Sequence, residues 1–526
     1  MFVRYIKNRY MLYPIGIQNF ENLRRNGYVY VDKTHFVYRL AATGKYYFLS
    51  RPRRFGKSLL LSTMEAYFQG KKELFSGLAI ESLEREWVEY PVLRLDFSGE
   101  NFSGPESLGM ALSNCLDGWE RRYGIEEYSG TYSIRFKNII ETAFRQTGRQ
   151  VVILIDEYDK PIVDNLGNEP LVESFRRELQ GFYSVMKAKD EYIRFGFLTG
   201  VTKIGKVSVF SGLNNLNDIS MDAGYYDICG ISDVDLRKYF DSGVEELAEA
   251  CGLTKDECYA KLAQMYDGYH FCEDSNGMYN PFSLLNTFQK MKFNEYWFET
   301  GTPSFLAEVM KNTDYDITML SHEQADSTLL TSIDTVFLNP IPLLYQSGYL
   351  TITDYDDFSG IYTLGFPNLE VKHGFLSYLL NYYTTARRGS GNLLIRQMSV
   401  DLRSGRPKDF MKRMEAFFAK QNYQIQADVE KDFQYAMSII QQLLGEYFTV
   451  RTEEPDSSGR TDITIATQQY IYIIEIKKDD SAQAALDQIE AKAYARRYGD
   501  DRRKVFRIGV SFSTETRAIE EWKVEE

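Results

Sequence analysis

Residues 46–64 read YYFLSRPRRFGKSLLLSTM, and this stretch decides the fold of the N-terminal part of the chain. Its first five residues form an aromatic and apolar run that is typical of a short buried strand. After Lys57 the sequence SLLLSTMEAYF carries apolar residues at helical spacing. The residues Gly56, Lys57 and Ser58 therefore lie between a strand and a helix, where a loop can bind a phosphate group.

The GKS residues predict defined contacts with a nucleotide. Gly56 lets the backbone approach closely, Lys57 would reach the β- and γ-phosphates, and the Ser58 hydroxyl would bind Mg²⁺. The general pattern is G-x-x-x-x-G-K-[ST], and here Arg51 takes the place of the first glycine. Arginine adopts a positive φ at greater cost than glycine, so we expect a different backbone path at the start of the loop. An isolated GKS also occurs in ordinary turns, so a second signal is needed.

The second signal is VVILIDEYDKPI at residues 151–162. A continuous apolar and β-branched run is typical of a fully buried parallel strand, and this one ends in Asp156 and Glu157. Asp156 would hold Mg²⁺ through water, and Glu157 would orient or deprotonate the attacking water. The alternative is that Asp156 only caps the next helix.

Two more apolar runs, at residues 92–97 and 193–200, complete the predicted sheet. Their alternation with helical patterns predicts a doubly wound α/β domain with its ligand at the carboxyl ends of the strands. Thr199, Thr202 and Lys203 lie at the end of the last run. They could sense the γ-phosphate, or they could form a simple transition from strand to loop.

The middle of the chain predicts a winged-helix unit. PIPLLYQSGYLTI at residues 340–352 indicates a helix followed by a strand, and IYTLGFPN at 361–368 indicates a returning strand. The turn between the strands, DYDDFSG, is acidic. A wing that contacts DNA needs Lys or Arg near the phosphates, so we expect this one to pack against the rest of the protein.

The C-terminal part predicts an α-β-β-β-α-β order from residue 430 onward, with a second group of charged residues inside it. On the strand YIYIIEIKK (470–478), alternation places Glu475 and Lys477 on one face. Burying two ions there needs compensation, which a divalent metal supplies. Asp462 and Glu475 would bind Mg²⁺, and Lys477 would position or activate a water. The alternative is a surface ion pair on an edge strand.

Four segments of the N-terminal part resemble one known family. They are YPIGIQNFENLRRNGYVYVDKT, RPRRFGKSLLLSTMEAYF, LIDEYDKPI and FLTGVTKIGKVSVFSGLNNLNDIS. Together they resemble the bacterial AAA-ATPase-like family, which is often fused to a nuclease domain and often carries the RPRRFGKS form of the loop. The resemblance implies a P-loop ATPase domain at residues 12–230 that uses ATP and Mg²⁺. YNPFSLLNTF resembles the helical lid of that family, which implies a lid, a winged helix and a connector at 231–420.

The C-terminal part resembles the PD-(D/E)XK nuclease superfamily. GRTD (459–462) and EIK (475–477) correspond to the Asp and Glu-x-Lys elements of that superfamily, and QIEAKAY (488–494) to its late Gln and Tyr. The resemblance implies a small α/β nuclease-like domain at 421–526, in which Glu430 contacts the metal from the first helix. Gln488 and Lys492 share a helix face and could meet nucleic-acid phosphates. Tyr494 taken alone fits a core position nearly as well.

Composition and charge exclude several other classes of protein. The five cysteines of the 526 residues are scattered without a C-x-x-C pair, and there are only four histidines, which argues against disulfide frameworks and zinc sites. The net charge of -13 gives no overall attraction to nucleic acid, so a local basic patch would be required. The chain contains no apolar stretch of membrane-spanning length, and its start does not resemble a signal peptide. We therefore expect a cytoplasmic protein that is not embedded in a membrane.

These signals together predict an ATP-binding and ATP-hydrolysing protein with a Mg²⁺-dependent nuclease domain. The expected partner is nucleic acid, with DNA preferred, and a homo-oligomer is left open. Gating of cleavage by the nucleotide state follows only from the fusion of the two domains. The alternative is a nucleotide-switched binding protein whose nuclease-like domain only holds nucleic acid or a protein partner.

Overall fold

The computed structural model describes residues 11–126, 130–203, 215–298, 304–313, 315–331, 333, 339–383, 390–419, 429–452, 461–492, 498, 501–516 and 518–526. The chain forms two compact units. The N-terminal unit comprises Met1–Tyr315 and Leu320–Lys372, and the C-terminal unit comprises Asp316–Met319 and His373–Glu526. The domain boundaries expected from the sequence, after residues 230 and 420, stay predictions.

The N-terminal unit is built on a parallel sheet in the order β2-β3-β4-β1-β5. Its strands are β1 (Tyr46–Ser50), β2 (Val92–Asp96), β3 (Val151–Asp156), β4 (Ile193–Gly200) and β5 (Asn217–Asp218). All four strand pairs are parallel. Every residue of β1 and β3 is buried, which explains their continuous apolar sequences.

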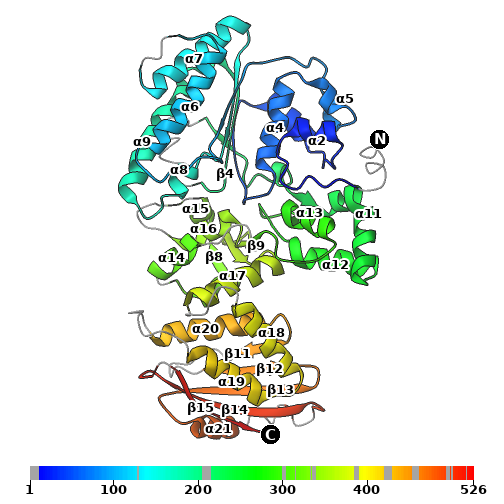
Figure 1. Cartoon of the computed structure of the whole chain (residues 1–526), viewed down its shortest axis with the longest axis vertical. Helices are drawn as coiled ribbons and strands as arrows, with labels where there is room; N and C mark the ends of the chain where they lie inside the picture. The colour runs from blue at the N-terminus through cyan, green and yellow to red at the C-terminus, as the bar shows by residue number, and fades with distance from the viewer. Residues whose placement is uncertain are drawn as a thin grey trace. The chain divides into compact units, whose positions relative to one another are not determined.

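Helices cover both faces of this sheet, as the sequence predicts for a doubly wound domain. Figure 1 shows α6, α7 and α9 on one side of the strands and α2, α4 and α5 on the other. The helices of this part are α2 (Phe20–Asn26), α3 (Thr34–Thr43), α4 (Lys57–Phe68), α5 (Ala79–Leu83), α6 (Ser107–Arg122), α7 (Tyr132–Thr147), α8 (Lys160–Val163) and α9 (Glu169–Ala188). The predicted strand at 46–50 and the helix after it are confirmed.

A small helical subdomain follows the sheet. It contains α11 (Asp233–Cys251), α12 (Lys255–Tyr266), α13 (Pro281–Lys290) and the antiparallel pair β6 (Ile231–Ser232) and β7 (Met278–Tyr279). Capping boxes at Ser232 and Thr254 begin the first two helices, and the Asn280 side chain caps the third. The helix predicted from YNPFSLLNTF is therefore present.

The predicted helix and hairpin of the winged-helix unit are also present. The elements are α14 (Ser304–Asn312), β8 (Glu323–Ala325), α15 (Ser327–Thr331), α16 (Pro340–Ser347), β9 (Thr351–Asp356) and β10 (Ile361–Gly365). The strands form an antiparallel sheet in the order β8-β10-β9. The next helix, α17 (Leu369–Tyr383), begins in the N-terminal unit and continues into the C-terminal unit.

The C-terminal unit contains a five-stranded mixed sheet in the order β11-β12-β13-β14-β15. Its elements are α18 (Ser390–Arg403), α19 (Pro407–Phe418), α20 (Val429–Leu444), β11 (Thr449–Thr452), β12 (Thr461–Ala466), β13 (Tyr470–Lys478), α21 (Ala482–Ala491), β14 (Lys504–Ser513) and β15 (Ala518–Glu525). Only β13 and β14 run parallel. The predicted α-β-β-β-α-β order is confirmed from α20 to β14, but the prediction missed β15. Its sequence AIEEWKVE has too little apolar alternation to indicate a strand, and pairing with β14 provides the missing support.

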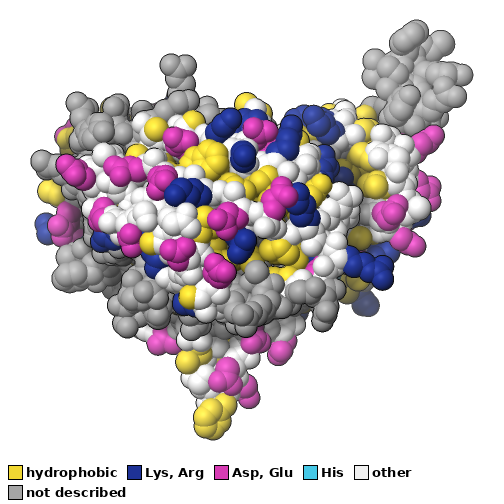
Figure 2. All heavy atoms as spheres, turned by 90° about the horizontal axis from the view of Figure 1, so that it is seen from below, with side chains coloured by type: hydrophobic (Ala, Val, Ile, Leu, Met, Phe, Trp, Pro, Cys, Tyr) yellow, Lys and Arg dark blue, Asp and Glu magenta, His cyan; other side chains and the backbone are white. Residues whose placement is uncertain are grey.

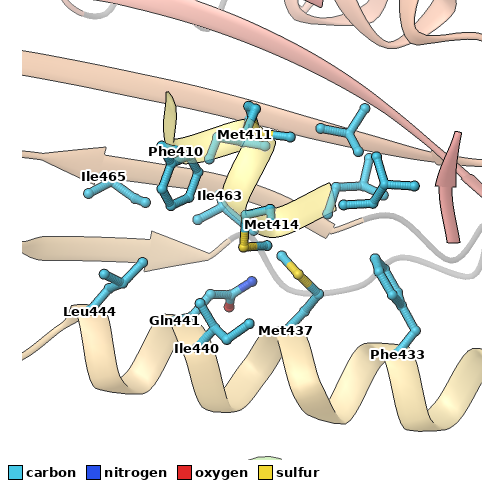
Figure 3. Close-up of a pocket in the computed structure, with 14 residues that line it drawn as sticks. Phe410, Met411, Met414, Phe433, Met437, Ile440, Gln441, Leu444, Ile463 and Ile465 are labelled. Carbon is cyan, nitrogen blue, oxygen red and sulfur yellow. The ribbon is translucent and has the colours of Figure 1, made fainter. Parts of the chain in front are cut away.

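Both faces of this second sheet are covered. Leu486 and Ile489 of α21 pack against Ile471 and Ile473 of β13. On the opposite face, side chains of α19 and α20 close over the sheet around a small apolar cavity. Figure 3 shows Met414 and Met437 pointing toward one another across that cavity. The described helices of the chain include none that is long and apolar enough to cross a bilayer.

Candidate functional site

The phosphate loop connects β1 to α4, as the sequence predicts. Gly56 has a φ of 95° and immediately precedes α4. A Cβ built on Gly56 would meet no atom of the described chain within 4 Å, so the backbone conformation and not space requires glycine here. Arg54 also has a positive φ, of 66°. The strained part of the loop therefore lies directly before the helix.

Lys57 is buried within its own loop. Its side-chain ammonium donates hydrogen bonds to the backbone oxygens of Arg51 at 2.9 Å and Pro52 at 3.0 Å. Burial lowers the pKa of the Lys57 ammonium, and the negative charges of Asp156 and Glu157 oppose that shift. Ser58, the second residue of α4, is half-buried beside it.

Arg51 has a structural role that the sequence does not reveal. Its side chain is 1% exposed, and its guanidinium donates to the backbone oxygens of Ser50 at 2.9 Å and Ser220 at 2.7 Å. The guanidinium carbon lies 3.9 Å from the centre of the Phe271 ring. The positive φ values of the loop belong to Arg54 and Gly56 and not to Arg51.

Asp156 closes β3 with a completely buried carboxylate. Its Oδ1 accepts a hydrogen bond of 2.6 Å from the Thr199 hydroxyl, and its Oδ2 has no hydrogen-bond partner among the described residues. A buried carboxylate oxygen without a partner is costly unless a cation or its water occupies the adjacent space. Asp156 does not cap the following helix, because the N-cap residue of α8 is Asp159.

Glu157 is held in an uncommon backbone conformation, with a φ of 52°. A residue other than glycine in this region costs free energy and is found most often at functional sites. Burial raises the pKa of the Glu157 carboxyl, and the charge of Lys57 opposes this. A raised pKa suits a group that takes a proton near neutral pH.

The polar residues at the end of β4 are engaged with carboxylates of the protein. The Thr199 hydroxyl donates to Asp156, and the Thr202 hydroxyl donates to Asp159 at 2.7 Å. The Lys203 ammonium lies 2.9 Å from an Asp218 oxygen. The sequence analysis did not single out Asp159. The signal available for it was a third acid two residues after Glu157, directly after an apolar run.

The sheet register explains why these residues meet. Strand β4 lies between β1 and β3, with Leu49 paired to Thr199 and Ile155 paired to Leu198. Because the three strands are parallel, their carboxyl ends lie at one edge of the sheet. The loop after β1, the acids at the end of β3 and the threonines at the end of β4 therefore lie at the same edge of the sheet.

The second candidate site lies at the end of β13. Glu475 is completely buried, and neither of its carboxylate oxygens accepts a hydrogen bond from the described residues. The Lys477 ammonium lies 3.8 Å from Glu475 Oε1 and donates a hydrogen bond to the side-chain oxygen of Gln488 on α21. The predicted shared face of Glu475 and Lys477 is therefore present, and β13 is a central strand, so the edge-strand alternative is wrong.

The other predicted residues of this site are only partly described. Asp462 and Glu475 are direct partners in the antiparallel pairing of β12 and β13, so their positions lie side by side. Glu430 is the second residue of α20. The side chains of Asp462 and Glu430, and all of Tyr494, lie outside the described residues. Lys492 follows the end of α21 and is exposed.

The donor sets of both sites fit Mg²⁺, which prefers carboxylate and hydroxyl oxygens. Each set contains a completely buried acid with at least one oxygen that lacks a hydrogen-bond partner among the described residues, Asp156 in one and Glu475 in the other. Among the described side chains, no three His, Cys, Asp or Glu residues gather closely enough to form a larger metal-binding group.

Positive and negative side chains are mixed on the face of the molecule shown in Figure 2. Figure 2 shows one face of the molecule on which Lys and Arg side chains are interspersed with Asp and Glu. On that face no extended area of a single charge covers the described residues. A nucleic-acid contact there would depend on a few basic side chains and not on a broad positive field.

Comparisons with known proteins agree with this division of the chain. A family model described as a predicted AAA-ATPase matches residues 14–210, and a model of the PD-(D/E)XK nuclease superfamily matches residues 428–522. A protein of Azotobacter chroococcum mcd 1, described as an uncharacterized protein in the vnfD 5'region, is 36% identical over 525 residues. That similarity covers 97% of this chain and 98% of the relative. The chain therefore belongs to a family of proteins in which an AAA-ATPase-like domain is joined to a PD-(D/E)XK nuclease superfamily domain.

Proposed function

We propose that the N-terminal unit binds ATP with Mg²⁺ and hydrolyses it. Ser58 and Asp156 would hold the metal, and the backbone of Gly56 and the start of α4 would bind the phosphates. The Oδ2 of Asp156, which has no hydrogen-bond partner in the described part of the chain, supports a cation at this edge of the sheet. Mg²⁺ bound there would neutralise part of the phosphate charge.

The side chains of the site have distinct tasks in this proposal. Lys57 exchanges its two backbone acceptors in the loop for phosphate oxygens, which keeps the buried ammonium hydrogen-bonded throughout. Thr199 holds Asp156 in place through its hydroxyl. Glu157 orients the attacking water and accepts its proton, for which its raised pKa is suited.

We propose further that the C-terminal unit cleaves phosphodiester bonds of nucleic acid, with DNA as the expected substrate. The observation that carries this proposal is the completely buried Glu475, which accepts no hydrogen bond from the described residues and lies 3.8 Å from Lys477. Glu475, Asp462 and Glu430 would hold Mg²⁺, which would polarise the scissile phosphate. Lys477 would position the attacking water and offset the developing negative charge. Gln488 holds Lys477 by accepting its hydrogen bond, and Lys492 would contact the phosphate backbone.

The nucleotide state of the N-terminal unit would gate this cleavage. The proposal rests on the union of the two domains in one chain. The cytoplasmic location expected from the sequence also stays a prediction.

Thermal unfolding of wild type and Glu475→Gln tests the metal site directly. Without Mg²⁺ the wild type keeps a buried carboxylate that accepts no hydrogen bond from the residues the structure describes, so Glu475→Gln should unfold at an equal or higher temperature. Mg²⁺ should raise the unfolding temperature of the wild type by more than that of the variant, which keeps only the proposed N-terminal metal site. Cleavage of DNA should be lost in the variant.

Two results would count against the C-terminal proposal. Equal stabilisation of both proteins by Mg²⁺ would show that Glu475 holds no metal. Wild type that binds DNA with Mg²⁺ and never cleaves DNA or RNA would favour the alternative, a nucleotide-switched binding protein.

A further inference from the structure

The short turn after β3 is joined to the end of β4 and the residues after it by hydrogen bonds of Tyr158 and Asp159. The Tyr158 backbone N–H donates to Thr199 O at 3.0 Å, and the Tyr158 hydroxyl donates to Thr202 O at 3.1 Å. The Asp159 carboxylate accepts hydrogen bonds from the Thr202 N–H at 2.6 Å, from its hydroxyl at 2.7 Å and from the Val201 N–H at 3.2 Å. We name this set of contacts the β3–β4 clamp.

Asp159 is the centre of the clamp. Its side chain is 1% exposed, and its carboxylate accepts hydrogen bonds from uncharged donors of Val201 and Thr202. Burial raises the pKa of the Asp159 carboxyl, while the hydrogen bonds from Thr202 oppose that shift. Burying a carboxylate costs free energy, and Asp159 is not one of the proposed metal ligands. A role other than packing would explain why an acid stands at this position.

Gly200 shows how closely the two segments approach. A Cβ on Gly200 would lie 2.6 Å from Asp159 Oδ1 and 2.6 Å from the ring of Tyr158. The φ of Gly200 does not require glycine. Glycine is needed there because the side chains of Tyr158 and Asp159 leave no room for a Cβ. The clamp is therefore a tightly packed contact with little room for the turn to move.

Glu157 lies between the two anchored acids of the turn. Asp156 on one side is tied to Thr199, and Asp159 on the other is tied to Thr202, so both anchors belong to the end of β4. Between them Glu157 adopts a φ of 52°, a conformation that persists only where the surroundings determine it. Together with the bond from Thr199 to Asp156, the β3–β4 clamp fixes the backbone conformation of Glu157 from both sides.

We propose that Asp159 is a positioning residue for ATP hydrolysis, which holds Glu157 in the conformation that orients the attacking water. This inference rests on the hydrolysis proposed above. Asp159 would act through Glu157, because its Oδ2 accepts the two bonds from Thr202 and both of its oxygens lie within hydrogen-bond distance of the Val201 N–H. A displacement of about 1 Å in such a group can lower a rate roughly a hundredfold.

The test measures kcat for ATP hydrolysis and the Kd of ATP for wild type, Asp159→Ala, Glu157→Gln and the double variant. We expect Asp159→Ala to lower kcat by roughly ten- to a hundredfold, with Kd changed by less than about threefold. In the Glu157→Gln background Asp159→Ala should lower kcat no further, because the group through which it acts is gone. Asp159→Asn should fall between wild type and Asp159→Ala.

Two further variants keep the test informative. Asp164→Asn removes the partly exposed acid that pairs with Lys160 on the same segment, and it should leave kcat unchanged. If Asp159→Ala does not fold, Thr202→Val removes one bond of the clamp with little change in shape, and it should lower kcat several-fold at constant Kd.

The possible failures are distinguishable. Equal loss of kcat in both Glu157 backgrounds, or a loss of ATP affinity matching the loss of kcat, would show a merely structural Asp159 and overturn the inference while leaving ATP hydrolysis intact. A wild type without hydrolysis, or a Glu157→Gln variant as active as wild type, would overturn the proposed function and this inference together.

Discussion

Arg51 stands where the general phosphate-loop pattern has glycine, and its side chain has a different role from that glycine. The pattern places glycine there for backbone freedom, whereas this protein uses the position to bury a guanidinium among backbone oxygens and against Phe271. The residues of the loop that have a positive φ are Arg54 and Gly56. Position 51 thus stabilises the loop from outside the phosphate site.

Arg51→Ala should destabilise the protein by roughly 3 to 5 kcal/mol, because several buried oxygens lose their donor and a cavity remains. Arg51→Gly, which restores the general pattern, should be no more stable. Arg53→Ala is the matched control, because Arg53 is exposed in the same loop and should cost less than about 0.5 kcal/mol. Urea unfolding measures both, and equal stabilities of the Arg51 and Arg53 variants would contradict this role.

Glu157 should give hydrolysis a distinctive pH dependence. The group must be ionised to accept a proton, and burial raises its pKa, so the rise of kcat with pH should be centred above the ordinary glutamate value of 4.5. The raised pKa also means that the folded state binds this proton more tightly than the unfolded state. Stability should therefore fall as pH rises from the ordinary toward the raised pKa, and Glu157→Gln should remove that loss.

Rate–pH profiles and urea unfolding over the same pH range check both parts. Since the carboxyl is only partly buried, we predict the direction of the stability change and not its size. A midpoint at or below the ordinary value, or a stability profile unchanged by Glu157→Gln, would contradict a raised pKa at this position.

At the scale of elements, β13 and α21 share the contact that orients the proposed nuclease lysine. Gln488 accepts the hydrogen bond of Lys477. Gln488→Ala should lower the rate of DNA cleavage roughly tenfold, as is typical when the group that orients a functional side chain is lost. The control is Gln483→Ala on the same helix, where the exposed amide bonds only Asp487 and Lys523 among the described residues. Equal cleavage by both variants would show that Gln488 does not orient Lys477.

The strands that carry the sites could be predicted because their sequences are locally unambiguous. Buried runs such as 151–156 and 470–478 are long, apolar and end in charged residues, so their type and their functional ends follow from pattern alone. The final strand β15 could not be predicted in this way, since its pairing with β14 and not its own pattern defines it.

Residues whose roles depend on distant partners were beyond the reach of sequence reasoning. Arg51 bonds to Ser220, which is 169 positions away, and Asp159 bonds to Thr202, which is 43 positions away. No local pattern encodes such contacts, because they depend on which strands become neighbours in the sheet. The proposed metal and phosphate positions, in contrast, follow from the strand ends that carry the candidate residues.

At the scale of the whole molecule, the first turn of α17 is joined to the phosphate loop by hydrogen bonds within the N-terminal unit. Glu370 in its first turn is completely buried, and its carboxylate accepts hydrogen bonds from the Ser283 hydroxyl of α13 and from the Trp297 N–H. The Trp297 indole in turn donates to Arg53 O of the phosphate loop at 3.2 Å. The first turn of α17 is thus connected to the phosphate loop through one residue, Trp297.

The central claim is that one chain couples ATP to cleavage of nucleic acid. The most direct measurement is cleavage of linear and circular DNA with Mg²⁺, with and without ATP, by wild type, Lys57→Ala and Lys477→Ala. We predict that ATP changes the wild-type rate by at least about fivefold, that Lys57→Ala cleaves at a rate independent of ATP, and that Lys477→Ala does not cleave. Cleavage by wild type at the same rate with and without bound ATP would contradict the coupling, and cleavage by Lys477→Ala at the wild-type rate would contradict the proposed nuclease site.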